Sequence, residues 1–199
     1  IVFDWDDTLL CTSWLMLRGS GRVRSRQEQA GNMLRSIAAH VRHLLEQAVQ
    51  LGRTMIITNA ASGWVEQSAA AFIPEALPIL QAVRVVSARS EYEPRFPNEV
   101  DQWKLQAFLE VQRQLDSQAI TNLVSVGDSD FEKEAAHALS RQYTRSLTKT
   151  VHFVQNPTPE DLERQLALVA QKFGRIVRSG RDLQVSLDKR PRRAEGQCA

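Results

Sequence analysis

Apolar and polar positions follow one another along this chain in a pattern typical of an α/β protein. Short apolar runs alternate with longer segments in which apolar residues recur every three or four positions, the spacing of one helix face. The apolar runs predict five strands, at residues 1–3, 54–58, 83–87, 122–126 and 151–154. The longer segments predict helices at residues 32–51, 62–72, 98–115 and 158–173, with one more ending near residue 140. This alternation favours a mainly parallel central sheet flanked by helices.

Polar side chains stand where three of the predicted strands end. Asp4 follows the first apolar run, and Thr58 is the last residue of the second. Asp128 stands two residues after the run that ends at residue 126. In open parallel sheets, ligands bind beyond the carboxyl ends of the strands. Asp4 and Asp6 lie two residues apart, so we expect their side chains to point the same way. Two neighbouring carboxylates repel unless a cation or a shared proton offsets their charge. The pattern therefore predicts a metal site, an acid/base pair, or both.

The stretch Asp4-Trp5-Asp6-Asp7-Thr8 matches the DxDxT signature of the haloacid dehalogenase-like (HAD) phosphohydrolases. Three further segments resemble the remaining motifs of this superfamily, in the same order. They are Thr58 with Asn59 after an apolar strand, Lys104 early in a helix, and Gly127-Asp128 followed four residues later by Glu132. The resemblance covers about residues 1–140 and implies a Rossmann-like fold.

The resemblance implies a role for each motif residue. Asp4 is expected to be the nucleophile that forms an aspartyl-phosphate. Asp6 is expected to be the general acid/base that protonates the leaving oxygen and then activates water. Thr58 and Asn59 are expected to bind the phosphoryl group, and Lys104 to bind it and offset the charge of Asp4. Asp6 and Thr8 favour phosphatase over dehalogenase chemistry.

The resemblance also implies a Mg²⁺ cofactor. The expected ligands are the Asp4 carboxylate, the Asp6 backbone carbonyl, Asp128 and Glu132, an oxygen donor set of the kind that Mg²⁺ prefers. Asp130 competes with Glu132 for the last position, and the pattern leaves both open. Together these residues predict a Mg²⁺-dependent phosphomonoesterase.

The chain resembles the HAD members that lack a cap domain. The two places where a cap is inserted, residues 12–31 and 88–98, are shorter than the roughly 40 residues that an independent unit needs. An open site suits a macromolecular substrate such as a phosphoprotein, or a partner that acts as the lid. Residues 18–26 contain four arginines, which predict either a solvated loop or a basic rim that attracts phosphorylated substrates.

The C-terminal part of the chain is basic. We expect a catalytic domain at residues 1–173 and a basic extension at residues 174–199. Residues 172–193 hold eight basic residues and two acids, which predict a solvated edge or a surface that docks an acidic partner. Nucleic acid is not favoured, because no aromatic residue interleaves with these arginines. A turn at residues 179–180 and alternating apolar residues at 183, 185 and 187 predict a small β-hairpin.

Composition changes this picture little. A length of 199 residues, 43% hydrophobic, predicts a single globular domain, and a net charge of +2 is too small to indicate nucleic acid or membrane. No apolar run approaches the 18 residues of a membrane span. Cys11 and Cys198 are expected to be reduced thiols of an intracellular protein. The chain opens inside a strand pattern at Ile1, so we expect that its natural N-terminus lies further upstream.

A second class of function fits the same residues. The HAD fold can serve as a non-catalytic subunit or scaffold of a larger assembly, with the basic segments docking to it. Loss of hydrolysis on Asp4→Asn substitution, with assembly retained, separates the two hypotheses.

Overall fold

The computed structural model describes residues 1–17, 30–114, 122–141 and 146–187. A six-stranded sheet runs through its centre in the order β3-β2-β1-β4-β5-β6, and every pair of neighbouring strands is parallel. The strands are β1 Val2–Phe3, β2 Met55–Thr58, β3 Arg84–Ser87, β4 Asn122–Gly127, β5 Leu147–His152 and β6 Leu183–Ser186. The predicted α/β architecture is confirmed, and the strand order is that of a Rossmann-like fold.

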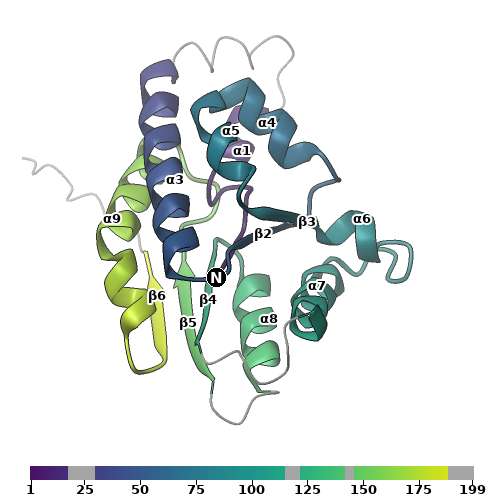
Figure 1. The fold of residues 1–199 in the computed structure, drawn as a ribbon. Coiled ribbons are helices and arrows are strands. Elements are labelled where there is room, and N and C mark those ends of the chain that lie inside the picture. Colours follow the sequence, from purple (N-terminus) through teal and green to yellow (C-terminus); the bar gives the residue numbers. More distant parts are fainter. Residues whose placement is uncertain (18–29, 115–121, 142–145, 188–199) are drawn as a thin grey trace, which may run out of the picture.

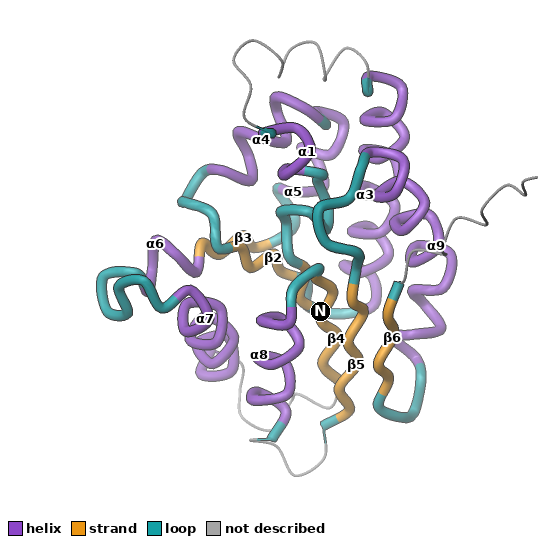
Figure 2. The backbone as a smooth tube through the Cα atoms, turned by 180° about the vertical axis from the view of Figure 1, so that it is seen from behind, coloured by secondary structure: helices purple, strands orange, loops and turns teal. Residues whose placement is uncertain are grey.

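Helices cover both faces of the sheet (Figure 1). One face carries α1 Thr12–Met16, α3 Gly31–Leu51, α4 Trp64–Phe72, the 3₁₀ turn η1 Pro74–Ala76, α5 Leu77–Leu80 and α9 Pro159–Arg178. The other carries α6 Ala88–Tyr92, α7 Val100–Gln114 and α8 Asp130–Ser140. Viewed from behind, the strands separate these two groups of helices (Figure 2). The result is a three-layer α/β/α domain with one apolar cluster on each side of the sheet.

Successive side chains of strand β1 point to opposite faces of the sheet. Val2 packs in the cluster with α7 and α8, whereas Phe3 packs in the cluster with α3 and α9. The Phe3 ring centroid lies 5.7 Å from that of Phe173 in α9. Because side chains alternate along a strand, Asp4 turns to the α7 layer, while Trp5 is fully buried in the α3 layer.

Helix α9 begins as its sequence predicts and ends later. The Thr158 side chain accepts a hydrogen bond from the Asp161 backbone N–H, and Pro159 occupies the first turn. Apolar side chains continue to Val177 on the buried face, so the helix continues to Arg178. The proposed domain boundary at residues 173–174 therefore falls inside this helix.

The predicted C-terminal hairpin is wrong. Residues 183–186 do form a strand, as their alternation indicates, but β6 pairs with β5 in parallel. The Leu187 backbone N–H extends this ladder by donating to the His152 carbonyl at 2.9 Å. Helix α9 carries the chain back past the sheet before β6 begins. The strand thus joins an existing sheet edge instead of folding onto its own neighbour.

Three local expectations also change. Strand β5 begins at Leu147, four residues earlier than predicted. Thr148, Lys149 and Thr150 are buried in this strand, but they are polar residues and therefore do not extend the apolar run in the sequence. Residues 88–92, which fall in none of the predicted helices or strands, form α6, whose start is capped by the Ser87 side chain. Helix α3 begins at Gly31, one residue before its predicted start, and no side chain caps that end.

Some predictions fall on parts that lie outside the described residues. These are the basic loop at 18–26, the basic tail beyond residue 187, and Cys198. In the described parts of the two cap positions, the structure has only the short helices α1 and α6. None of the described helices has the length and apolar character needed to span a membrane.

Lys149 joins three elements at the end of the sheet where the strands begin. Its side chain is fully buried, and its amine donates 2.7 Å hydrogen bonds to the Asn122 side-chain oxygen and to the Val177 carbonyl. The Asn122 amide also donates to the Val177 carbonyl at 2.8 Å. Strands β4 and β5 are thereby tied to the last turn of α9. Burial lowers the pKa of Lys149 from its usual value of 10.5, because the interior disfavours the charged amine.

Replacement of Lys149 by Met is expected to lower the free energy of unfolding by about 1–3 kcal/mol at neutral pH, since the Val177 carbonyl and the Asn122 side-chain oxygen lose the donor that Lys149 supplies. A lowered folded-state pKa means that the unfolded state binds the proton more tightly. The wild-type free energy of unfolding therefore rises with pH between the folded-state pKa of Lys149 and 10.5. It decreases again when the pH is lowered through the same range. Denaturant unfolding at several pH values should show a wild-type advantage over Lys149→Met that widens with pH. An advantage that stays constant would contradict this account.

Candidate functional site

The motif residues meet at the carboxyl ends of three adjacent strands. Asp4 follows β1, Thr58 closes β2, and Asp128 follows β4. The Asp4 backbone N–H donates to the Val126 carbonyl at 2.8 Å, which fixes the end of β1 against β4. The order of the sheet reverses between β1 and β4, the topological switch point at which α/β sheets bind ligands. The pattern-based placement of the site agrees with this geometry.

A tight turn after β1 presents the first motif. The Trp5 carbonyl accepts from the backbone N–H groups of Leu9 at 2.8 Å and Leu10 at 3.1 Å. Asp7 has a positive φ of 55°, a conformation that Asp adopts more readily than most residues. Its carboxylate accepts from the Ser13 backbone N–H at 2.9 Å and so holds the start of α1. Burial raises the pKa of Asp7 above its usual value of 3.8. Asp7 is thus a structural acid of the turn.

Asp4 forms a buried ion pair with Lys104. The Lys104 Nζ atom lies 2.8 Å from Asp4 Oδ1, and the two residues are only 3% and 5% exposed. Lys104 reaches the strand end from the first turns of α7. Removing two charges from water is costly, and a close opposite charge offsets the cost. The structure thus brings together the expected nucleophile and the expected cation.

Asp6 has a different pair of partners. Its Oδ2 atom accepts from the Thr58 hydroxyl at 3.1 Å, and its Oδ1 atom accepts from the Trp64 indole N–H at 2.9 Å. The Thr58 oxygen also accepts from the Ala60 backbone N–H at 3.0 Å. Sequence reasoning missed Trp64. Its only signal was an indole donor at the start of the helix that follows Thr58.

Two further expected residues lie close to this centre. The Thr8 hydroxyl donates to Asp128 Oδ1 at 3.4 Å, which links the first motif to the fourth. The Asn59 side-chain amide donates to the Val100 carbonyl at the start of α7, at 3.4 Å. Its Oδ1 atom is buried without a hydrogen-bond partner. The amide donor expected to bind phosphate is therefore directed to the α7 backbone in this structure.

Only some of the expected Mg²⁺ ligands belong to the side chains that the structure describes. Asp4 and Asp128 bring carboxylate oxygens to neighbouring strand ends, and oxygen donors of this kind suit Mg²⁺. Among the described side chains, no group of three His, Cys, Asp or Glu is arranged to hold a metal ion. The predicted set contains a backbone carbonyl at Asp6, and the Glu132 side chain lies outside the description. Asp130 is exposed at the start of α8. The chemistry of the described donors fits the predicted ion.

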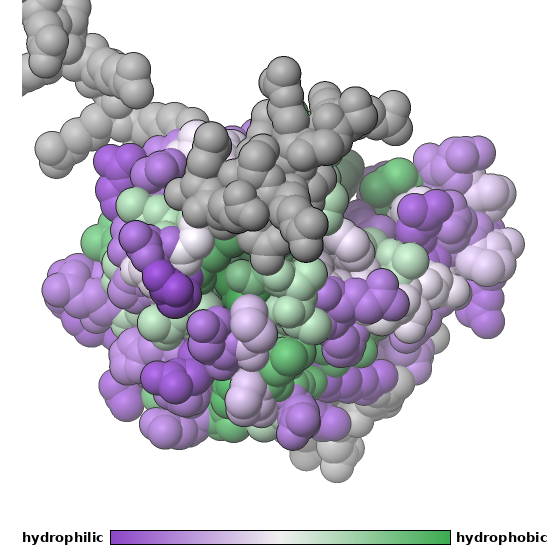
Figure 3. All heavy atoms as spheres, turned by 90° about the horizontal axis from the view of Figure 1, so that it is seen from above, coloured by the Kyte–Doolittle hydropathy of each residue, from purple (hydrophilic) through white to green (hydrophobic). Residues whose placement is uncertain are grey.

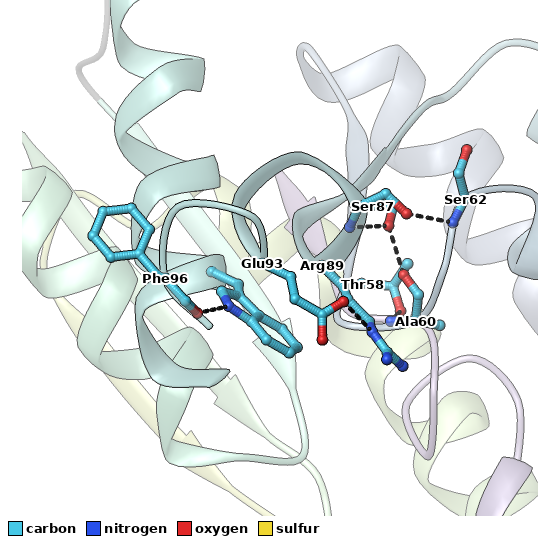
Figure 4. A network of polar contacts seen from close by, with 9 residues as sticks. Thr58, Ala60, Ser62, Ser87, Arg89, Glu93 and Phe96 are labelled. Atoms are coloured by element: carbon cyan, nitrogen blue, oxygen red, sulfur yellow. Dashed lines mark hydrogen bonds and ion pairs between the residues drawn. The ribbon is translucent and has the colours of Figure 1, made fainter. Parts of the chain in front are cut away.

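Side chains at the end of β3 hold the loop that follows β2. The Ser87 hydroxyl donates to the Ala60 carbonyl at 2.6 Å and accepts from the Ser90 backbone N–H at 3.0 Å. The Ser90 hydroxyl accepts from the Ser62 backbone N–H at 3.0 Å. Figure 4 shows these contacts linking the two loops beside Thr58. They border a small cavity of about 60 Å³ whose lining includes Thr58, Ser87 and the Glu66 side of α4.

Other features near the site bear on its chemistry and surface. Cys11 is buried and free, and burial raises the pKa of its thiol to about 12, so it is no candidate nucleophile. Large apolar side chains are exposed on segments that border the strand ends, at Met16, Leu17, Val100 and Phe131. Seen from above, the molecule shows apolar groups gathered among hydrophilic ones (Figure 3).

Comparisons with protein-family models, with curated proteins and with solved structures found no match to this chain. The resemblance to the HAD superfamily therefore rests on the four motifs and on where the structure places their residues.

Replacement of Lys104 by Met is expected to lower the free energy of unfolding by about 3–5 kcal/mol, because it leaves the Asp4 carboxylate buried without its cation. Adding Asp4→Asn to that variant should recover part of the loss, since the uncompensated charge is then gone. Chemical denaturation of the two single variants and the double variant measures the coupling. Additive losses would show that the 2.8 Å contact carries no interaction energy.

Proposed function

We propose that this protein is a Mg²⁺-dependent phosphomonoesterase of the HAD type. The observation that carries the proposal is the buried 2.8 Å ion pair between Lys104 and Asp4 at the switch point of the sheet. Asp6, Thr58 and Asp128 surround it from the ends of adjacent strands. A carboxylate held beside a fixed ammonium, with a second carboxylate two residues away, suits phosphoryl transfer through a covalent intermediate.

The first half-reaction transfers the phosphoryl group to Asp4. A carboxylate oxygen of Asp4 attacks phosphorus, and the bond from phosphorus to the leaving oxygen breaks. Asp6 gives its proton to that oxygen, so the product leaves as an alcohol. Lys104 offsets negative charge on the phosphoryl group and on Asp4. Thr58 orients the group by hydrogen bonding.

The second half-reaction hydrolyses the aspartyl-phosphate. Asp6, now without its proton, accepts one from a water molecule, and the hydroxide formed attacks phosphorus. The bond from phosphorus to the Asp4 oxygen breaks, which releases inorganic phosphate and restores the carboxylate. Asp6 regains its proton in the same step, so the cycle closes.

Asp4, the Asp6 carbonyl, Asp128 and Glu132 would hold Mg²⁺. Bound there, the ion would neutralise phosphate charge and polarise phosphorus toward attack. The residues of the chain supply the nucleophile, the proton and the orienting hydrogen bonds.

A macromolecular substrate, such as a phosphoprotein, is the substrate class we propose. In its support, the described segments at both cap positions hold only the short helices α1 and α6. Exposed Met16, Val100 and Phe131 on neighbouring segments offer apolar contact to a large partner. The basic segments would add attraction for phosphate or for an acidic partner.

Hydrolysis of an aryl phosphate is expected to require Mg²⁺ and to stop on addition of EDTA. Substitution of Asp4 by Asn should lower kcat by at least about 10³-fold, since the amide cannot form the covalent intermediate. Release of inorganic phosphate measures both effects. Asp101→Asn is the matched control, because Asp101 is an exposed acid on the first turn of α7, and it should keep wild-type activity.

Absence of metal-dependent hydrolysis from folded wild-type protein would contradict the proposal. Co-purification of a stable partner with that inactive protein, retained by Asp4→Asn, would favour the scaffold hypothesis instead.

A further inference from the structure

Each oxygen of the Asp6 carboxylate has its own hydrogen-bond donor. The Trp64 indole N–H lies 2.9 Å from Oδ1, and the Thr58 hydroxyl lies 3.1 Å from Oδ2. The two donors come from different elements, the first residue of α4 and the last residue of β2. Asp6 therefore accepts one hydrogen bond on each carboxylate oxygen in the absence of substrate.

The two donors are not equivalent. A threonine hydroxyl carries a single proton, so Thr58 cannot donate to Asp6 and to a phosphoryl oxygen at the same time. The Ala60 backbone N–H fixes the Thr58 oxygen at 3.0 Å but leaves its proton free to turn. If that proton turns to the phosphoryl group, Asp6 loses its contact at Oδ2. The indole N–H of Trp64 is a donor only and faces no such competition.

We propose that Trp64 is the positioning residue of the acid/base: its indole N–H holds the Asp6 carboxyl group in place when Thr58 transfers its hydrogen bond to the phosphoryl group. The inference rests on the proposed function, because it assigns Trp64 a part in that reaction. It adds a residue that lies outside the four motifs.

The surroundings of Trp64 suit a fixed donor. The side chain is half-buried, and Gly63 before it adopts a positive φ of 83°, which sets where α4 begins. The Ser68 hydroxyl donates to the Trp64 carbonyl at 2.7 Å and accepts from the Trp5 indole at 2.9 Å. Trp5 belongs to the first motif, between Asp4 and Asp6. The same turn of α4 therefore holds the first motif at two points, Trp5 and Asp6.

The loop before Trp64 is also held in place. The Ser87 and Ser90 contacts join residues 60–62 to the end of β3 (Figure 4). Thr58 and Trp64 thus lie at the two ends of one short, tethered loop. Their spacing across Asp6 is consequently set by the fold and does not depend on a substrate.

The test compares a poor and a good leaving group. An alkyl phosphate needs protonation of its leaving oxygen, whereas a 4-nitrophenyl phosphate needs little. Trp64→Phe keeps an aromatic ring and removes the N–H. It is expected to lower kcat/KM at least about tenfold for the alkyl phosphate, the worth of one hydrogen bond to a charged group. For the nitrophenyl ester kcat/KM should change by less than about threefold.

Trp103→Phe is the matched control. The Trp103 indole also donates one hydrogen bond, to the Phe96 carbonyl at 2.7 Å, and it does not contact Asp6. This variant should change kcat/KM for the two substrates by the same factor. Equal losses on both substrates in Trp64→Phe as well would overturn the inference, because they would show a general structural defect.

A second measurement does not depend on turnover. In a ¹H–¹⁵N spectrum, the Trp64 indole signal is assigned by its loss in Trp64→Phe. That signal is expected to move in Asp6→Ala, while the Trp103 signal stays in place. An unmoved Trp64 signal would overturn the contact itself. A moved signal with no metal-dependent hydrolysis in the wild type would instead reject the proposed function and, with it, the catalytic part of Trp64.

Discussion

The candidate site depends on one buried ion pair. Asp4 and Lys104 lie 2.8 Å apart and are almost completely removed from water. Either charge alone would be strongly destabilising there, so each residue requires the other. The pair also joins the end of β1 to the first turns of α7, two segments about 100 residues apart in the chain. Asp4, the proposed nucleophile, therefore has a fixed cation beside it before any substrate binds.

The topology of the sheet explains why the other polar groups meet at this pair. Strands β2 and β4 flank β1 on its two sides and run in the same direction. Their carboxyl ends bring Thr58 and Asp128 to the same edge as Asp4. The helical layers then supply the side chains that the strands lack, Lys104 from α7 and Trp64 from α4. The candidate site is therefore built from side chains at the strand ends and side chains near the starts of two helices.

Sequence patterns predicted the sheet, the strand ends and the placement of Asp4, Thr58 and Lys104, because apolar periodicity and motif order both depend on local spacing. They missed contacts that depend on how distant segments fold together. Trp64 reaches Asp6 only because the loop after β2 is tethered to β3. Strand β5 was shortened in the prediction because buried Lys149 resembles a surface residue in sequence. The hairpin at residues 183–187 was predicted from alternation, which marks a strand without naming its partner.

The most direct test of the central claim is chemical identification of the phosphorylated residue. Protein mixed with an aryl phosphate and Mg²⁺ is quenched in acid during turnover and treated with borohydride, which reduces an acyl phosphate to an alcohol. Peptide mass spectrometry then locates the change. The account predicts conversion of Asp4, and of no other aspartate, to homoserine, and its disappearance in Asp4→Asn. Phosphate release with no reduced residue, or with reduction at another aspartate, would contradict it.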